Sequence, residues 1–264
     1  MFIKNNHIAN QLYVPYTRNI RGLAQSARRL ATGEKVPTAA DGGGELGVAD
    51  RWQQVIRGTD KLIGGMENTM SYIRTQDELI KQSTEILQRM SELAAVALDT
   101  TKNTTDRIAL DAEFQALENE FSQVYTKQYN GISLFGRSLG VRIGKEGGET
   151  LAFSVISLGG LTFTTMTLSQ LASASAALIS LTSRIGSINK LKAKVGNNSN
   201  ELSRVIDFTR QHIRNLANAE SFIRNVDLAI EAGNFTKKQV VLSASQSILS
   251  QSNGIVQSAM QFLG

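Results

Sequence analysis

The sequence of 264 residues contains no cysteine and only two histidines, His7 and His212. Without cysteine the chain can form neither a disulfide nor a thiolate zinc site, and it has no cysteine nucleophile. The two histidines stand far apart and have no companion motif, so a histidine metal site or histidine-centred catalysis is not expected. The sequence therefore predicts a protein that is not an enzyme and that uses no cofactor and no metal.

Proline is equally scarce, since Pro15 and Pro37 are the only two and both lie near the start. A proline ring breaks a helix by clashing with its preceding turn, so the rest of the chain can form long helices. The sequence has no run of about 18 uncharged apolar residues and no pattern of a cleavable secretory signal. No membrane partner is expected. A cytoplasmic protein agrees with this pattern, and so does export that leaves the N-terminus uncut.

Charge is distributed unevenly. Residues 1–40 contain six lysines and arginines against the single anion Glu34, which accounts for the whole formal net charge of +5. A basic arm of this kind can bind nucleic acid or an anionic membrane. Its cations are interleaved with aliphatic residues instead of clustering on one face, which disfavours both partners. A basic coiled-coil protein that binds nucleic acid remains the alternative from a different functional class.

Hydrophobic periodicity predicts a mainly α fold, an elongated coiled-coil helical bundle. From Leu178 to Ile223 aliphatic residues recur at alternating steps of three and four, which is the seam of a coiled coil. At a rise of 1.5 Å per residue this helix is about 70 Å long and needs a long partner. Residues 50–99 are predicted to be that partner. A third helix is predicted to begin at Asp106 as its N-cap.

Between residues 130 and 165 the hydrophobic period changes to two. Val141 and Ile143 alternate with polar neighbours, as do Leu151 and Phe153, and a glycine-rich turn lies between the two runs. This pattern predicts a small β-hairpin annex at about residues 140–165. Leu161 and Phe163, which follow Gly159 and Gly160, are interpreted as a third short strand.

Each end of the chain carries an amphipathic apolar set with no local core to bury it, and such helices are marginal when isolated in water. A glycine run at residues 42–44 and Gly233 are expected to detach the two arms, which stay mobile until covered. Self-assembly is the economical interpretation, because head-to-tail contacts that do not close generate a helical filament. The residues predicted to make these contacts are Ile8, Leu12, Ile20, Leu23 and Leu30 at the front, and Phe235, Val241, Ala244, Ile248, Ile255 and Phe262 at the rear.

Five colinear segments resemble bacterial flagellin, the subunit of the flagellar filament. They are residues 10–35, 87–94, 129–135, 141–153 and 220–253, and the last includes Arg224, Asp227, Phe235, Thr236, Lys237 and Gln239 of the family's closing signature. The resemblance implies that the terminal arms, residues 1–44 and 224–264, pair into the inner tube of a filament. Residues 45–223 would form the surrounding helical shell. The chain is accordingly expected to be a structural subunit that polymerises with itself, or with other flagellins, for motility.

The same resemblance implies an extracellular location in the flagellum. It implies uncleaved passage through the flagellar type III export apparatus, a chaperone on the C-terminal arm, and addition beneath a filament cap protein. Residues 36–41 depart from the family pattern, so a hook-filament junction protein, which shares the terminal plan, is the alternative within this class.

The resemblance also extends to positions through which many flagellins engage a vertebrate Toll-like receptor. These positions correspond to Arg89 and Leu93 on the second helix and Glu113 on the third. A helix-helix interface inside the filament is the competing interpretation of the same residues.

Overall fold

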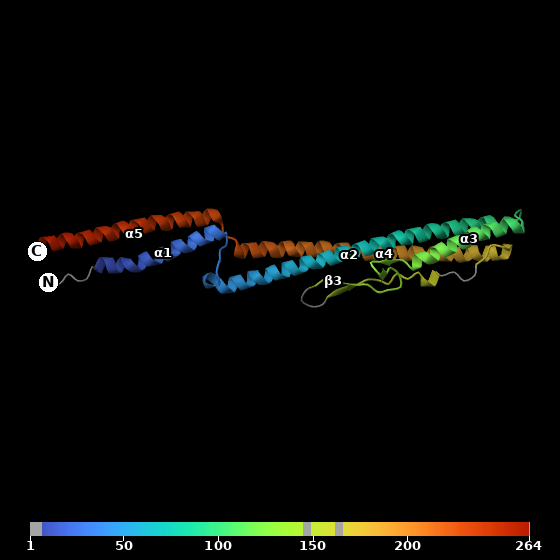
Figure 1. The fold of residues 1–264 in the computed structure, drawn as a ribbon, viewed down its shortest axis with the longest axis horizontal. Coiled ribbons are helices and arrows are strands. Elements are labelled where there is room, and N and C mark those ends of the chain that lie inside the picture. Colours follow the sequence, from blue (N-terminus) through green and yellow to red (C-terminus); the bar gives the residue numbers. More distant parts are fainter. Residues whose placement is uncertain (1–6, 145–148, 162–165, 264) are drawn as a thin grey trace. The chain divides into compact units, whose positions relative to one another are not determined.

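The computed structural model describes residues 7–144, 149–161 and 166–263. In this part of the chain five α-helices dominate and two small antiparallel strand pairs accompany them (Figure 1), which confirms the predicted mainly α fold with a β annex. The helices are α1 (His7–Thr32), α2 (Ala39–Ala97), α3 (Thr104–Tyr125), α4 (Leu171–Arg224) and α5 (Leu228–Leu263).

The chain forms two compact units. The terminal unit comprises Met1–Gln54 and Asn215–Gly264, and the central unit comprises Val55–Arg214. Helices α2 and α4 each contribute residues to both units. The predicted division into an inner tube and a shell concerns the assembled filament and stays a prediction.

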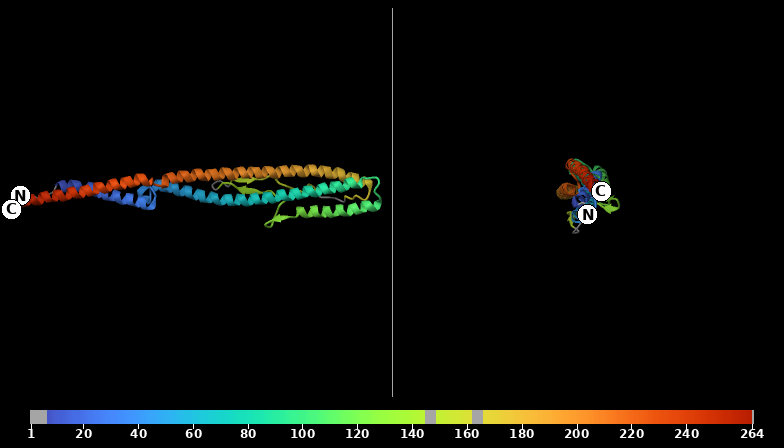
Figure 2. Two further views of the ribbon diagram at one scale, coloured as in Figure 1. Left: turned by 90° about the horizontal axis from the view of Figure 1, so that it is seen from above. Right: turned by 90° about the vertical axis from the view of Figure 1, so that its left-hand side faces the viewer.

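Two rows of apolar side chains at seven-residue steps form the core of the central unit, where α2 and α4 run side by side (Figures 1 and 2). The row on α2 is Met66, Ile73, Ile80, Leu87 and Ala94, and the row on α4 is Leu181, Ile188, Val195 and Leu202. All of them are buried, and α3 adds Phe114 and Phe121 to the same core. Burial contributes about 1.5–3 kcal/mol for each large side chain. The coiled-coil repeat predicted for this stretch of α4 is therefore confirmed.

Helix α3 begins at Thr104, two residues before the predicted N-cap. Its N-cap is Asn103, whose side chain accepts a hydrogen bond from the backbone N–H of Asp106 at 2.9 Å. The Asp106 carboxylate accepts one from the backbone N–H of Asn103 at 3.1 Å. This reciprocal pair is a capping box, so Asp106 is the third residue of the helix and not its cap.

The β annex consists of two hairpins. The predicted one pairs β3 (Gly140–Arg142) with β4 (Thr150–Ala152), and Val141 lies opposite Leu151. The second pairs β1 (Gln128–Tyr129) with β2 (Ile132–Ser133) around Asn130 and Gly131, both with positive φ. Asn-Gly is a typical two-residue hairpin turn, so the signal for this hairpin was present in the sequence. Of the predicted third strand, Leu161 instead ends the short 3₁₀ helix η1 (Gly159–Leu161), and Phe163 lies outside the described residues.

The two glycine signals differ in outcome. Helix α2 starts at Ala39 but is kinked at Gly42, whose backbone is non-helical, so a break does lie within the glycine run. Gly233 lies inside α5, so the break between the last two helices comes earlier, at residues 225–227. Asp227 causes this earlier start, because its side chain accepts hydrogen bonds from the backbone N–H groups of Ala229 and Ile230 at 2.9 and 3.1 Å.

Among the described residues, one helix, α4, is long enough and apolar enough over an 18-residue window to cross a membrane by length and composition alone. The buried core helix of a soluble protein passes the same test, so length and composition do not identify α4 as a membrane span. Its buried row faces the core of the central unit. The expected absence of a membrane partner stays a prediction.

The core of the central unit can be tested with two isoleucines of α4. Ile188 is fully buried, whereas Ile179 is 70% exposed. We expect Ile188→Ala to lower the free energy of unfolding by about 2–5 kcal/mol, because it leaves a cavity. The matched change Ile179→Ala should alter it by less than about 0.5 kcal/mol. Urea unfolding followed by circular dichroism measures both, and equal effects would show that this α4 row is not the core.

Candidate assembly surface

Helices α1 and α5 pack against each other within one chain, side by side in Figures 1 and 2. The Lys238 ammonium donates hydrogen bonds to the carbonyl oxygen of Gly22 at 3.1 Å and to the hydroxyl of Ser26 at 2.7 Å. Arg29 lies 3.9 Å from Glu231. Residues that come later in α1 contact residues that come earlier in α5, so the two helices are antiparallel. The two termini therefore form a paired helical domain within one chain, as the resemblance implies.

The surface that joins the two helices, here called the seam, is built largely from small and polar side chains. Its most buried members are Ser26, Glu231 and Ser252. Three residues of the predicted apolar sets are half-buried: Leu23, Leu30 and Phe235. The seam positions recur at steps of three and four, as in a coiled coil. They are Asn19, Gly22, Leu23, Ser26, Arg29 and Leu30 on α1, and Glu231, Phe235, Lys238, Leu242, Ser245, Leu249 and Ser252 on α5.

Large apolar side chains remain on the outside of this pair. On α1 the α1 stripe consists of Tyr13 and Ile20, which the smaller Ala27 continues, and on α5 the α5 stripe consists of Val241, Ile248 and Ile255. Ile20 is 41% exposed, and the three members of the α5 stripe are 40%, 49% and 62% exposed. Ala244 beside the α5 stripe is exposed as well. Tyr13 was not among the predicted residues, although it continues the same seven-residue step.

The structure thus separates the predicted self-assembly residues into two groups. Ile20, Val241, Ala244, Ile248 and Ile255 are exposed, whereas the half-buried residues contribute to the seam within the chain. The side chains of three further predicted residues lie outside the described residues. They are Ile8, Leu12 and Phe262.

Charge is absent from the far end of both helices. Beyond Lys238 the sequence contains no Asp, Glu, Lys, Arg or His as far as its last residue, and between His7 and Arg18 it contains none either. Exposed apolar side chains in these stretches are interspersed with serine and glutamine. Depletion of charge is typical of the buried centre of protein interfaces, where an unpaired ion would be costly to desolvate.

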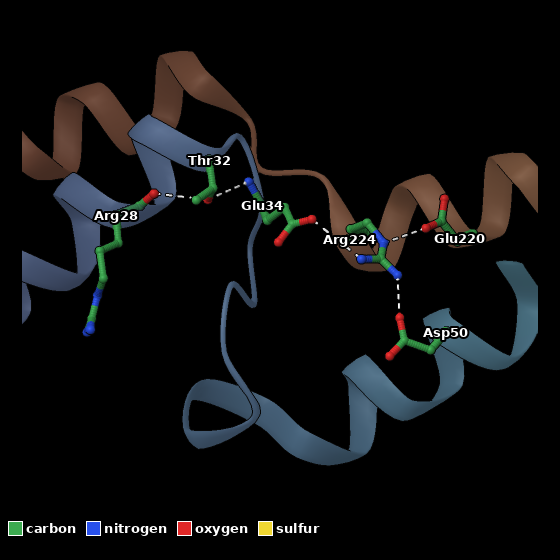
Figure 3. Close-up of polar contacts among 6 residues, drawn as sticks. All are labelled: Arg28, Thr32, Glu34, Asp50, Glu220 and Arg224. Atoms are coloured by element: carbon green, nitrogen blue, oxygen red, sulfur yellow. Dashed lines mark hydrogen bonds and ion pairs between the residues drawn. The ribbon is translucent and has the colours of Figure 1, made fainter.

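The end of α1 and the start of α5 meet at Arg224, the last residue of α4 (Figure 3). Its guanidinium donates hydrogen bonds to Asp50 on α2 at 2.7 Å and to Glu220 on α4 at 2.5 Å. A third, longer one reaches Glu34, which follows α1, at 3.4 Å. The hydrogen bonds that Arg224 donates to Asp50 and then to Glu220 raise the pKa of Arg224 above its ordinary value. The side chain is only 19% exposed, so these charge-assisted bonds are partly shielded from water.

Backbone hydrogen bonds bridge the same place. The N–H of Lys35 donates to the carbonyl oxygen of Arg224 at 2.7 Å, and the N–H of Val226 donates to that of Gly33 at 2.9 Å. Gly33 can end α1 here because its positive φ suits a residue without a side chain. The Thr32 hydroxyl accepts a hydrogen bond from the N–H of Glu34 (Figure 3). The sequence offered no signal for this junction, since its partners lie more than 170 residues apart.

Of the three residues predicted to contact a receptor, two are exposed and one is buried. Arg89 on α2 donates hydrogen bonds to one carboxylate oxygen of Glu113 on α3 at 2.6 and 3.0 Å, and both side chains are about half exposed. Leu93 is buried in the core of the central unit. Among the described residues no group of three or more His, Cys, Asp or Glu side chains could hold a metal ion.

Two family models match the chain. The model described as the bacterial flagellin N-terminal helical region matches residues 3–138, and the one described as the bacterial flagellin C-terminal helical region matches residues 167–263. The first range includes α1, α2 and α3, and the second includes α4 and α5.

The relatives differ in how much of each chain the match covers. A flagellin from Halalkalibacterium halodurans is 26% identical over 100% of both chains, and flagellin FlaB2 of Treponema pallidum is 24% identical over 98% of this chain and 99% of its own. Flagellin A of Vibrio anguillarum is 31% identical over 52% of this chain, which is 37% of its own length.

Two solved structures have a similar fold. Bacillus cereus flagellin has a TM-score of 0.51 and 28% sequence identity, over 55% of this chain and 88% of its own. A putative flagellar hook-associated protein from Vibrio parahaemolyticus has a TM-score of 0.54 over 71% of this chain and 98% of its own. Its identity of 11% shows a shared fold alone.

The Arg224 junction can be tested by hydrogen exchange. We expect Arg224→Leu to speed amide exchange at Lys35 and Val226 by at least about tenfold, because losing even one of its three charge-assisted hydrogen bonds costs about 1.5 kcal/mol. The matched control is Arg214→Leu, whose guanidinium bonds Gln211 on the same helix. It should leave both amides unchanged. Equal protection in the Arg224 variant would mean that the backbone bridge holds without the guanidinium.

Proposed function

Because the chain belongs to the bacterial flagellin family and is a structural subunit of the flagellar filament, we propose that its α1–α5 pair is the self-assembly surface of that filament. The observation that carries the proposal is the pair of exposed stripes on helices that already pack together through other residues. Neither a basic nucleic-acid-binding role nor a hook-filament junction role is favoured by the family matches.

The free energy available from burying the stripes, compared with the cost of association, agrees with a chain that is monomeric when dilute. Complete burial of a valine or isoleucine contributes about 1.5–3 kcal/mol. The four valine and isoleucine side chains of the two stripes are about half exposed in one chain. Covering them in an assembly would therefore contribute about half of this free energy for each, or about 3–6 kcal/mol in total. Two proteins lose about 4–15 kcal/mol in freedom when they associate. One stripe contact is therefore too weak to hold a dimer, whereas a subunit held by neighbours on several sides of a polymer is retained.

Further partners follow from the family. We expect the uncleaved chain to pass through the flagellar export apparatus and to be added beneath a cap protein at the growing, extracellular end. Before export a chaperone is expected to cover the α5 stripe, because an uncharged apolar surface of this kind associates nonspecifically when it is left exposed.

The exposed ion pair between Arg89 and Glu113 supports a role in engaging a host Toll-like receptor. Both side chains can reach a partner at the surface of α2 and α3, whereas Leu93 would act by holding the two helices together. This role belongs to the monomer, and packing inside the filament competes for the same face.

Assembly can be tested on α5 alone. We expect Ile248→Asp to raise the critical concentration for filament growth at least about 100-fold, because burying an uncompensated carboxylate costs about 3 kcal/mol or more. The melting of the monomer should not change, since Ile248 points away from the seam. Asn234→Asp, an exposed position in the charged first part of α5, is the matched control and should polymerise normally. Sedimentation and electron microscopy measure both, and normal growth of the Ile248 variant would remove α5 from the assembly surface.

Receptor engagement is tested with cells that carry the receptor. We expect Arg89→Ala monomer to need on the order of tenfold higher concentration for half-maximal activation, as expected for loss of one charged contact. Arg74→Ala, an exposed arginine on the same helix, serves as the control. An unchanged response of the Arg89 variant would count against these contacts.

A further inference from the structure

Helix α2 contains two adjacent glycines, Gly64 and Gly65, inside the central unit. Glycine is the poorest helix former after proline, because its backbone has the most conformational freedom to lose. A glycine inside a helix is often explained by a neighbouring segment that leaves no room for a side chain. Both of these glycines are exposed instead, and within the described part of the chain no neighbouring element lies within 4 Å of the position that a Cβ atom would take. Close packing therefore does not explain the pair.

The chain leaves room on two sides of α2 at this point. On the side of α4, Gly64 lines a groove of about 510 Å³ together with Arg210 and Ile213. On the side of β3, Gly65 lines a cavity of about 230 Å³ together with Val141. A helix that packs closely against its neighbours is held straight by them, whereas one with space on two sides lacks this support. There is therefore space for α2 to bend in either direction.

The hydrogen bonding next to the pair also favours a bend. The Thr69 hydroxyl donates a hydrogen bond to the carbonyl oxygen of Gly65 at 3.0 Å. In a helix the same oxygen accepts from the backbone N–H four residues later, which is that of Thr69 as well. A threonine that bonds back in this way often bends its helix. Its hydroxyl also keeps the carbonyl paired when a bend lengthens the backbone hydrogen bond, so bending leaves no acceptor without a partner.

The rest of α2 in the central unit is better supported. The buried row of the core begins at Met66, directly after the pair, and residues 66–97 contain no glycine. Glu67 forms an ion pair with Arg210 on α4. Nearer its start the same helix is already kinked at a glycine, Gly42. Within the central unit, the backbone freedom of α2 is therefore concentrated just before its core row.

From these observations we infer that Gly64 and Gly65 form a hinge in α2. Sharp bends in helices are found at residues of this kind, and a hinge consists of a few positions that absorb the backbone rotation. The helix as the structure shows it is one state. In the other states the part of α2 before the pair tilts toward α4 or toward β3, while the part from Met66 onward keeps its place in the core.

A hinge at this place lets a subunit adjust to its neighbours. The part of α2 before the pair carries Asp50, which accepts a hydrogen bond from Arg224 at the junction. A tilt therefore changes the direction of a segment that is bonded to this junction, and the core of the central unit stays intact. This use of the hinge rests on the proposed function, whereas the hinge itself is a property of the single chain.

Disulfide trapping tests the hinge in the dilute monomer, because the chain has no natural cysteine. One pair, Asp60→Cys with Arg214→Cys, lines the groove toward α4. A second pair, Lys61→Cys with Arg142→Cys, lines the cavity toward β3. A disulfide requires Cα atoms about 4.4–6.8 Å apart, so its rate of formation with a fixed concentration of oxidant reports how often α2 tilts toward each side.

Each cysteine pair is studied in the unaltered chain and together with Gly64→Ala and Gly65→Ala. We expect the two alanines to slow both disulfides by at least about tenfold, because alanine favours the helical backbone more than glycine does. Mass spectrometry after alkylation of the remaining thiols measures the rates, and circular dichroism verifies that each variant is folded.

Two controls are matched to this experiment. Gly43→Ala combined with Gly44→Ala changes another adjacent and exposed glycine pair of the same helix, and it should leave both rates unchanged. A third cysteine pair, Arg74→Cys with Asn200→Cys, lines a cavity beside α2 and α4 beyond the hinge. Its rate should not respond to the alanines at the hinge.

Unchanged rates for the first two disulfides in the chain with both hinge alanines would overturn the inference. An equal slowing of all three disulfides would overturn it too, because that result indicates a general gain in stability. Both measurements use the monomer, so they are independent of assembly. If the unaltered chain forms no filaments while its hinge is confirmed, the proposed function alone fails.

Discussion

The pairing of α1 with α5 uses a seam in which serine, glycine and charged side chains occupy positions that leucine and isoleucine take in a stable coiled coil. Lys238 reaches across to Gly22 and Ser26, and Glu231 is buried beside Arg29. Small side chains let the two backbones approach, while the polar groups demand particular partners and so favour one register. Because the seam consumes few large apolar residues, most of these are left on the outside, where they are available to other copies of the chain.

The Arg224 junction complements the seam by holding one end of the pair. Three carboxylates from three segments surround one guanidinium, and two backbone hydrogen bonds bridge residues 33–35 with residues 224–226. The end of α1 and the start of α5 are therefore fixed beside each other before any neighbour is present. A pair anchored at one end keeps its register along its length at a low entropic cost, because each helix is stiff.

The central unit packs by a different rule. Its rows on α2 and α4 are aliphatic at successive seven-residue positions, and every member is buried within the chain. The apolar side chains of this core are buried within one chain, whereas the terminal pair leaves many of its apolar side chains exposed. One chain thus combines a region whose stability is its own with a region that gains most of its stability from assembly, as expected of a subunit that must stay apart until it is added to a polymer.

The sequence by itself determined the local structure and the repeat. Seven-residue spacing identified the cores of α2 and α4, and two-residue spacing identified the hairpin at Val141 and Leu151. Asn130–Gly131 is also a typical hairpin turn, although it was not used to predict the first hairpin. These features are local, because helix and strand periods are set by backbone geometry. The residues of the terminal stripes were also visible as apolar positions. Only the tertiary structure decided that Leu23 and Phe235 face the seam while Ile20 and Ile248 face outward, since both sets have the same spacing and differ only in rotation about the helix. It also decided that Arg224 meets Glu34 and Asp50, because contacts between residues so distant in the chain depend on how whole helices are brought together.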